Sequence, residues 1–317
     1  MTPLQPGDPS RISGYRLLGR LGSGGMGHVY LGQTSDGRKV AVKVIRPEFA
    51  ADPEFRARFR REASAMMAVS SRYTVKVVGA DPDGEPAWLA SEYVDASALD
   101  AAVHKRGPLP VAGVFRLAAG LAEALDTIHR AGLTHRDLKP SNVLLGRDGP
   151  RVIDFGLAVG DHSSGVTRTG IVVGTPSYMS PEQIGGVQVG PKSDVYSLGA
   201  VLTFAAVGRA PHGDGPVQEV MLRILHQQPN LAGIDDSLLP MIEACLVKDP
   251  ALRPASSHVL HVLRTLPQDT PRKPAAPPAP EVPPTQPAPA QPASEAPATV
   301  PAFKQRIVRT FPPGKHR

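Results

Sequence analysis

The amino-acid sequence predicts an α+β fold of two lobes, a small lobe built on an antiparallel sheet with one helix and a larger, mainly helical lobe. Between residues 15 and 94, short segments that alternate or are rich in β-branched residues are separated by Gly and Asp turns, which is typical of antiparallel strands. From Val111 onward, apolar residues recur at spacings of three and four, which indicates helices. Where the two patterns meet, at residues 92–95, we expect the cleft between the lobes.

In chain order, the expected strands are 15–21, 28–34, 39–45, 75–81 and 86–94, and one amphipathic helix at 53–69 interrupts them. The first helix of the larger lobe begins at Val111 and is closed by Gly132, because glycine commonly ends helices. Further helices are predicted at 193–207, 217–227, 238–247 and 255–266.

A change of composition near Leu266 predicts the end of the folded part. Of the 35 prolines in the 317 residues, 15 lie between 267 and 317, and residues 267–302 contain no aromatic side chain. Such a stretch cannot bury enough apolar surface to offset its conformational entropy. We therefore expect a flexible N-terminus at 1–10, the sheet lobe at 11–94, the helical lobe at 95–266 and a disordered Pro/Ala-rich tail at 267–317.

The tail ends in a basic segment, 303–317, that contains no acidic residue. Its two interpretations are a solvated tail and a segment that docks to an acidic partner or an anionic membrane surface.

Charge and cysteine content narrow the class of protein. The 35 Lys+Arg against 29 Asp+Glu give a net charge of +6, too mild over this length to indicate nucleic-acid binding. A lone cysteine, Cys245, excludes an internal disulfide framework and fits a reducing compartment. No apolar run reaches the roughly 18 residues that cross a bilayer, and the first residues lack the pattern of a signal peptide. We expect a cytoplasmic protein without a transmembrane span.

The residues from Gly22 to Gly27 fit the pattern G-x-G-x-x-G. In a dinucleotide-binding oxidoreductase this pattern follows a strand and opens a helix. Here the residues after Gly27 alternate like strands, so the glycine loop joins two strands of a hairpin, where backbone without side chains can close over phosphates. A purely structural glycine turn is the alternative.

Lys43 lies within an apolar strand, and Glu62 falls on the apolar stripe of the helix at 53–69, together with Phe55, Phe59 and Met66. A carboxylate on such a stripe is costly unless it finds a partner. An inward-facing Lys43 is the candidate partner, and a lysine held in this way presents its ammonium group to phosphate oxygens. The alternative is a lysine that points to water.

The segment from 135 to 156 carries the most specific pattern. If residues 143–145 and 151–153 pair as an antiparallel hairpin, Asn142 and Asp154 lie at the same end of it. An amide oxygen and a carboxylate in that position make an oxygen-rich site suited to Mg²⁺ carrying a polyphosphate. Asp137, five residues before Asn142, stands beside this site and can accept a hydroxyl proton.

With these motifs in order, residues 11–266 resemble a protein serine/threonine kinase of the bacterial, eukaryotic-like type common in actinobacteria. The resemblance implies that Asp137 is the catalytic base or hydroxyl-orienting group, that Lys139 neutralises charge on the γ-phosphate, and that Lys43 binds the α- and β-phosphates and pairs with Glu62. It implies Asn142 and Asp154 as ligands of Mg²⁺, with Mn²⁺ as the alternative ion. It implies an ATP site formed by Leu21, Gly22, Ser23, Gly24, Gly25, Met26, Gly27, His28, Val29, Ala41, Lys43, Glu92 and Val94.

The same resemblance implies activation by autophosphorylation, at Thr167 and Thr169, with Arg136 as the docking group for the phosphate. It implies protein substrates with Ser or Thr acceptors and a homodimer for autophosphorylation. Glu182 with Arg253, and Asp194, resemble scaffold contacts of the helical lobe. Two features depart from relatives of this type: Ser91, before the segment Glu92 to Val94, is small and leaves room behind the adenine, and we expect neither a transmembrane helix nor an extracellular sensor.

Two other functions compete with this prediction. A pseudokinase or scaffold would bind ATP or partners without turnover, but such proteins usually lose the lysine, the catalytic aspartate or a metal ligand, and all of these residues are present here. A dinucleotide-binding oxidoreductase would need a helix directly after Gly27 and has no use for Asp137, Asn142 and Asp154.

Overall fold

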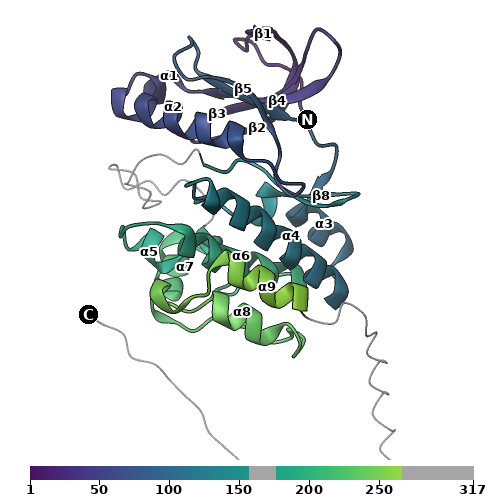
Figure 1. Cartoon of the computed structure of the whole chain (residues 1–317), viewed down its shortest axis with the longest axis vertical. Helices are drawn as coiled ribbons and strands as arrows, with labels where there is room; N and C mark the ends of the chain where they lie inside the picture. Colours follow the sequence, from purple (N-terminus) through teal and green to yellow (C-terminus); the bar gives the residue numbers. More distant parts are fainter. Residues whose placement is uncertain (157–175, 266–317) are drawn as a thin grey trace, which may run out of the picture. The chain divides into compact units, whose positions relative to one another are not determined.

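The computed structural model describes residues 1–156 and 176–265, all within a unit that spans Met1–Gln268 (Figure 1). A sheet occupies one end of this unit, and most of the helices lie at the other end (Figure 1). Thr167, Thr169 and the tail at 267–317 lie outside the described residues.

The sheet has six antiparallel strands in the order β1-β2-β3-β4-β6-β5. These strands are β1 (Arg11–Ile12), β2 (Tyr15–Gly24), β3 (Gly27–Gln33), β4 (Lys39–Ile45), β5 (Val77–Asp81) and β6 (Trp88–Glu92). All five strands predicted from the sequence are present, and the two-residue β1 is an addition. A small apolar cluster covers the outer face of the sheet, with Tyr30, Val40, Val42 and Trp88 among its buried members. Because side chains alternate along a strand, Ala41 and Lys43 point to the opposite, inner face.

Two helices follow β4, the short α1 (Pro47–Ala50) and α2 (Pro53–Ala68), which contacts β5. Asp52 caps α2 by accepting a hydrogen bond from the backbone N–H of Glu54, and Pro53 occupies the first turn, where its missing N–H costs nothing. The buried side chains of α2 are Phe55, Phe59, Ala63 and Met66. Glu62, three residues after Phe59 and four before Met66, lies on the same side of α2, and 14% of its side chain is exposed.

The helical part is centred on α4 (Val111–Arg130) and α6 (Pro191–Val207), which contact each other. Residues 193–205 of α6 are all buried, as expected of a helix that other elements surround. Around this pair lie α3 (Leu99–Arg106), α5 (Pro181–Ile184), α7 (Val217–His226), α8 (Leu239–Cys245) and α9 (Ser256–Thr265), together with short 3₁₀ turns at Pro140–Asn142, Pro176–Tyr178 and Pro250–Leu252. Among residues 1–156 and 176–265, no helix combines the length and apolar character that a membrane span requires.

A second sheet of three short strands, β7 (Ser97–Ala98), β8 (Val143–Gly146) and β9 (Gly149–Val152), joins the two parts. The hairpin predicted from the sequence is present, but its register differs by one residue: Val143 pairs with Val152 instead of Ile153, and Gly146 pairs with Gly149. The bridge between Thr74 and Val152, and the hydrogen bond from Val75 N–H to Val152 O (3.1 Å), attach this hairpin to the segment that leads into β5.

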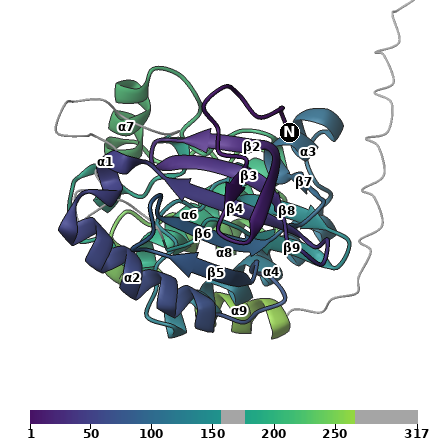
Figure 2. The ribbon, with the colours of Figure 1, turned by 90° about the horizontal axis from the view of Figure 1, so that it is seen from above.

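Residues 1–10, which we expected to be flexible, make specific contacts with the six-stranded sheet. Thr2 forms a backbone bridge with Arg20, Leu4 packs against the outer apolar cluster, and the carboxylate of Asp8 lies against Arg20 and Tyr30. In the view from above, the segment near the N-terminus crosses the purple strands of the sheet (Figure 2). These contacts join residues that are distant along the chain, so no local sequence pattern predicts them.

Candidate active site

The glycine motif lies in the β2–β3 hairpin, where Gly24 pairs with Gly27 across the turn formed by Gly25 and Met26. This confirms that the motif joins two strands and does not open a helix. A Cβ at Gly27 would lie 2.0 Å from Val44 O, so close packing on β4 requires glycine there. A Cβ at Gly22 or Gly24 would meet no protein atom within 4 Å, so the space beside these two residues is free of protein atoms. Leu21, Ser23 and His28 complete the hairpin end.

Lys43 lies on the inner face of β4, directly opposite Val29 on β3. Its Nζ is 3.4 Å from Oδ1 of Asp154, and 16% of its side chain is exposed. The lysine therefore does not point freely into water. The contact brings β4, which pairs with β3 of the glycine hairpin, next to the end of the β8–β9 hairpin. Lys43 and Asp154 are 111 residues apart in the sequence.

Asn142 and Asp154 flank the β8–β9 hairpin at one end, as the sequence predicts. The Ile153 N–H donates to Asn142 O (3.0 Å), so the two chain segments remain paired up to this point. Asp154 has φ 57°, a left-handed conformation that is rare for a residue other than glycine. Such conformations persist where the surrounding structure enforces them, and they cluster at functional sites.

Asp137 is held on both sides. The Asn142 Nδ2 donates to the backbone O of Asp137 (2.8 Å) and to its Oδ2 (3.1 Å), and Lys139 Nζ donates to Oδ1 (3.0 Å) and Oδ2 (2.8 Å). The side chain of Asp137 is nevertheless 52% exposed. A carboxylate that is fixed in orientation and open to solvent can accept a proton from an incoming hydroxyl group.

The chemistry of these side chains fits a magnesium ion. Since Asn142 uses its amide nitrogen on Asp137, its carbonyl oxygen is the group left to bind a cation. The carboxylate of Asp154 is 38% exposed and adds a second hard oxygen ligand. Within the described ranges, no three His, Cys, Asp or Glu side chains converge, so phosphate and water oxygens would have to complete the coordination shell.

Glu62 does not pair with Lys43, and this corrects the expectation from the sequence. Its Oε1 accepts from Nη1 of Arg136 at 3.1 Å, whereas Lys43 contacts Asp154. The largely buried carboxylate does find a cation, but this cation is the guanidinium group of Arg136, the residue before Asp137, whose long side chain reaches α2. Burial raises the pKa of Glu62, and the charge of Arg136 only partly opposes this rise.

Arg136, expected to dock a phosphate on Thr167 or Thr169, is thus occupied by Glu62. Its backbone has φ 65°, a strained conformation for a non-glycine residue. The two threonines themselves fall in the segment 157–175, outside the described part of the chain.

The backbone just before Asp137 is fixed by Asp194 on α6, whose side chain is 1% exposed. Its carboxylate accepts from the N–H groups of His135 and Arg136, both at 2.8 Å, and pairs with Nε2 of His129 at 2.7 Å. Gln183 adds a hydrogen bond from Nε2 to Arg136 O (2.7 Å). The roles of His129 and Gln183 are missing from the sequence prediction; the one signal for His129 is its position in the last turn of α4.

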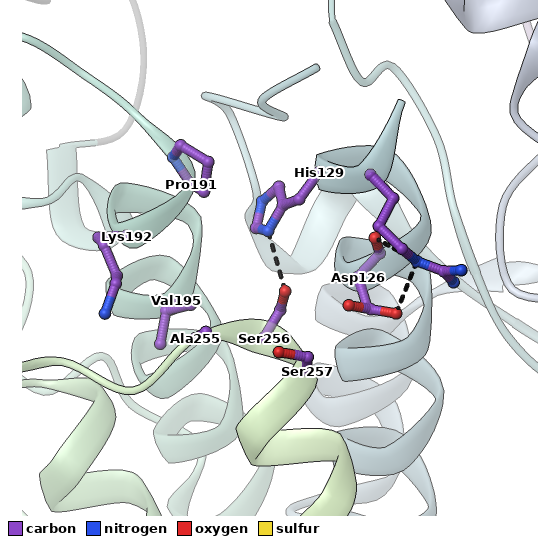
Figure 3. Close-up of a pocket in the computed structure, with 9 residues that line it drawn as sticks. Asp126, His129, Pro191, Lys192, Val195, Ala255, Ser256 and Ser257 are labelled. Atoms are coloured by element: carbon purple, nitrogen blue, oxygen red, sulfur yellow. Dashed lines mark hydrogen bonds and ion pairs between the residues drawn. The ribbon is translucent and has the colours of Figure 1, made fainter. Parts of the chain in front are cut away.

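His129 also lines a cavity of about 220 Å³ between the end of α4 and the beginnings of α6 and α9 (Figure 3). Its Nδ1 is hydrogen-bonded to Ser256 Oγ at 3.0 Å, and Arg130 pairs with Asp126 at 3.0 Å. The cavity does not include Lys43, Asp137, Asn142 or Asp154. It is therefore separate from the site that these residues form.

The segment expected to contact adenine begins at the end of β6. Ser91 pairs with Ala41 in the ladder, and Val94 follows the strand. The side chain of Glu92 turns away to Arg151, whose Nη1 donates to Oε1 at 2.9 Å. No local sequence pattern predicts this ion pair, because Arg151 lies on β9, 59 residues away.

The sequence comparison assigns this architecture to a family. The family model described as "Protein kinase domain" matches residues 15–263. The chain belongs to the protein kinase family. The kinase is 51% identical over 263 residues to the "Probable serine/threonine-protein kinase PkwA" of Thermomonospora curvata, covering 83% of this chain and 35% of that protein. It is 52% identical over 249 residues to the "Serine/threonine-protein kinase AfsK" of Streptomyces coelicolor, covering 78% and 31%.

Among solved structures, the kinase resembles the PknI kinase domain of Mycobacterium tuberculosis, with a TM-score of 0.63 and 29% sequence identity, over 80% of this chain and 96% of that one. This chain spans about a third of the length of PkwA and AfsK. The resemblance recognised in the motifs and the bilobal fold predicted from the sequence are confirmed.

Proposed function

We propose that this kinase transfers the γ-phosphate of ATP to serine or threonine hydroxyl groups of proteins. The observation that carries the proposal is the convergence of one ammonium group and two oxygen ligands beside a fixed, exposed carboxylate: Lys43 lies against Asp154, and Asn142 holds Asp137. Phosphoryl transfer needs positioning and charge neutralisation more than covalent chemistry, and this set provides both. No residue of the set is missing, so nothing favours a pseudokinase.

Each residue has a role in the proposal. Lys43 neutralises phosphate charge, Lys139 orients Asp137 and meets the transferred group, and Asp137 accepts the hydroxyl proton. Asn142 and Asp154 would hold Mg²⁺, which supplies charge neutralisation of the polyphosphate, with Mn²⁺ as the alternative ion. The residues 21–29, Ala41, Lys43, Glu92 and Val94 would surround ATP. Glu62 would join Lys43 only after leaving Arg136.

The proposal predicts that Lys43→Met abolishes transfer of radiolabelled γ-phosphate to a generic basic acceptor protein. The variant removes the ammonium group that the nucleotide phosphates require, and a loss of at least about 100-fold is expected. The matched control is Lys39→Met, because Lys39 lies on the same strand but is exposed and close to the ring of Tyr93, 5.9 Å from its centroid. Full activity of Lys43→Met, or equal losses in both variants, would contradict the proposal.

We also propose that phosphorylation of Thr167, Thr169 or both activates the kinase, through autophosphorylation within a homodimer. The ion pair between Arg136 and Glu62 supports this, because a phosphate carries nearly two negative charges and would compete with one carboxylate for the same guanidinium group. Mass spectrometry of active protein is expected to find phosphate on at least one of the two threonines, and on neither in Lys43→Met. Active protein with both threonines unmodified would refute the idea.

We further propose that the kinase acts in the cytoplasm on protein substrates. The count of one cysteine, which allows no internal disulfide bond, supports a reducing compartment. Cys245 itself is fully buried, and burial raises its pKa to about 12, so it is an inert core residue.

A further inference from the structure

The N-terminal segment lies along the open edge of β2. Thr2 N–H donates to Arg20 O (2.9 Å), and Arg20 N–H donates to Thr2 O (2.8 Å). A Cβ at Gly19 would lie 2.8 Å from Thr2 O and 3.2 Å from Cγ of Met1, so the two backbones approach closely. Since β1 pairs with the beginning of β2, the segment around Thr2 extends the contact along this edge to Arg20, in the middle of the strand.

A single carboxylate reinforces this contact. Arg20 donates to Oδ2 of Asp8 from Nε (2.7 Å) and to Oδ1 from Nη2 (2.6 Å), and the Tyr30 hydroxyl donates to Oδ1 (2.7 Å). The Gln5 N–H donates to Oδ2 at 2.7 Å. Only 3% of the Asp8 side chain is exposed. Hydrogen bonds between such a carboxylate and a guanidinium fork are strong because both partners are charged.

The three side chains remain in the protonation states that this network needs. The hydrogen bonds from Arg20 hold the pKa of Asp8 well below its usual range, despite the burial of the carboxyl group. Burial, followed by the hydrogen bond to Asp8, raises the pKa of Tyr30 to about 12. At neutral pH Asp8 is therefore ionised, and the Tyr30 hydroxyl keeps its proton.

The network of Asp8, Arg20 and Tyr30 lies in the sheet directly before the glycine-rich end of the β2–β3 hairpin. Arg20 and Tyr30 are direct cross-strand partners in the β2–β3 ladder, and the register shifts between Arg20 and Gly22. Beyond this bulge only three pairs remain, ending with Gly24 and Gly27. Asp8 thus fastens both strands at the last regular pair before the glycine-rich tip, whose Gly22 and Gly24 have no protein neighbour at the Cβ position.

We infer that residues 1–8 form an N-terminal clamp in which Asp8 is a positioning residue: it fixes the base of the glycine hairpin and so presets the place of the tip over ATP. Asp8 acts through Arg20 and Tyr30 and touches no reacting atom. A preset tip has less conformational freedom to lose when the nucleotide binds. The effect on ATP rests on the proposed function, whereas the fastening of the hairpin base does not.

The test compares the full chain with Asp8→Asn, with Tyr30→Phe and with a chain that lacks residues 1–9. Asp8→Asn keeps the shape of the side chain and removes its charge, and Tyr30→Phe removes one hydrogen bond. The matched control is Asp36→Asn, because Asp36 pairs with Arg38 at 3.0 Å in the exposed β3–β4 turn, at the opposite end of β3 from the glycine tip. The readouts are KM for ATP, kcat, KM for a basic acceptor protein, and hydrogen exchange of the amides of residues 20–30.

Asp8→Asn and the shortened chain are expected to raise KM for ATP by roughly three- to tenfold, with kcat and the KM for acceptor changed less than about twofold. Tyr30→Phe should give a smaller rise in the same direction. Amide exchange at residues 20–30 should accelerate in all three, and Asp36→Asn should match the wild type in every measurement.

Unchanged KM for ATP in both Asp8→Asn and the shortened chain would overturn the inference. A lower melting temperature with unchanged KM would also overturn it, because it would reveal a merely structural contact. If the wild-type chain transfers no phosphate, the proposed function fails, and hydrogen exchange still decides the clamp: unchanged protection of residues 20–30 in Asp8→Asn and in the shortened chain refutes it.

Discussion

Asp137→Asn is expected to slow phosphate transfer by roughly 10²- to 10⁴-fold while ATP still binds. The substitution keeps the shape of the side chain and its position beside Lys139 and Asn142, but an amide cannot accept the hydroxyl proton. The measurements are kcat with a basic acceptor protein and the dissociation constant of Mg²⁺-ATP by titration calorimetry.

The control for this variant is Asp148→Asn, in the exposed turn between β8 and β9. Asp148 lies in the turn at the end of the β8–β9 hairpin opposite to Asn142, so loss of its charge should leave kcat within about twofold. If Asp137→Asn retained more than about a tenth of wild-type kcat, Asp137 would not act as the proton acceptor.

Arg253→Met is expected to destabilise the folded kinase by about 3–5 kcal/mol, the usual cost of removing one partner from a buried ion pair. The side chain of Arg253 is 0% exposed, and it donates to both carboxylate oxygens of Glu182 (2.6 and 2.8 Å). It also donates to the backbone oxygens of Val247, Lys192 and Lys248. In the variant, the three backbone oxygens would lose their hydrogen-bond donor. The buried Glu182 carboxylate would lose its ion-pair partner. A fall in Tm of roughly 10 °C or more should follow in thermal unfolding.

The matched control is Arg264→Met, because Arg264 pairs with Glu123 at 2.8 Å but is 62% exposed. Such surface pairs contribute about 0–1 kcal/mol. Equal effects of the two substitutions on the free energy of unfolding would show that burial of the Arg253 pair has no energetic consequence.

The same pair gives stability a dependence on pH. Burial opposes ionisation of Glu182, but the hydrogen bonds from Arg253 and Ser193 outweigh it and lower the pKa of the carboxyl group below its ordinary value of 4.5. The unfolded chain therefore takes up the proton first. The contribution is complete above pH 4.5 and disappears as the pH falls through the lower pKa of the folded state. In Arg253→Met, the loss of stability at acidic pH should be smaller.

Short-range patterns account for most of what the sequence could predict. The β8–β9 hairpin was foreseen because two short apolar segments flank a Gly-containing turn, and any such hairpin brings Asn142 and Asp154 to one end; the register itself differs by one residue from the predicted one. α3 was missed because its eight residues contain one short apolar repeat, Leu99 with Ala102 and Val103, which is too little to mark a helix.

Long-range pairings were beyond the sequence. The helical spacing of α2 shows that Glu62 approaches the apolar side, but not whether Lys43 or Arg136 reaches it, and the structure selects Arg136. Asp8 finds partners 12 and 22 residues away, in strands whose own pattern is already complete without it. A local period reports the face of an element and not the identity of its distant neighbour.

The ion pair between Glu92 and Arg151 has a mechanical consequence. Glu92 ends β6, where the chain passes out of the six-stranded sheet, and Arg151 lies three residues before Asp154. Arg151 also donates to Thr74 O at 3.2 Å. The connection between the lobes and the strand that leads to Asp154 are therefore tethered to each other, so a rocking motion of one lobe against the other should carry both along as a single rigid piece.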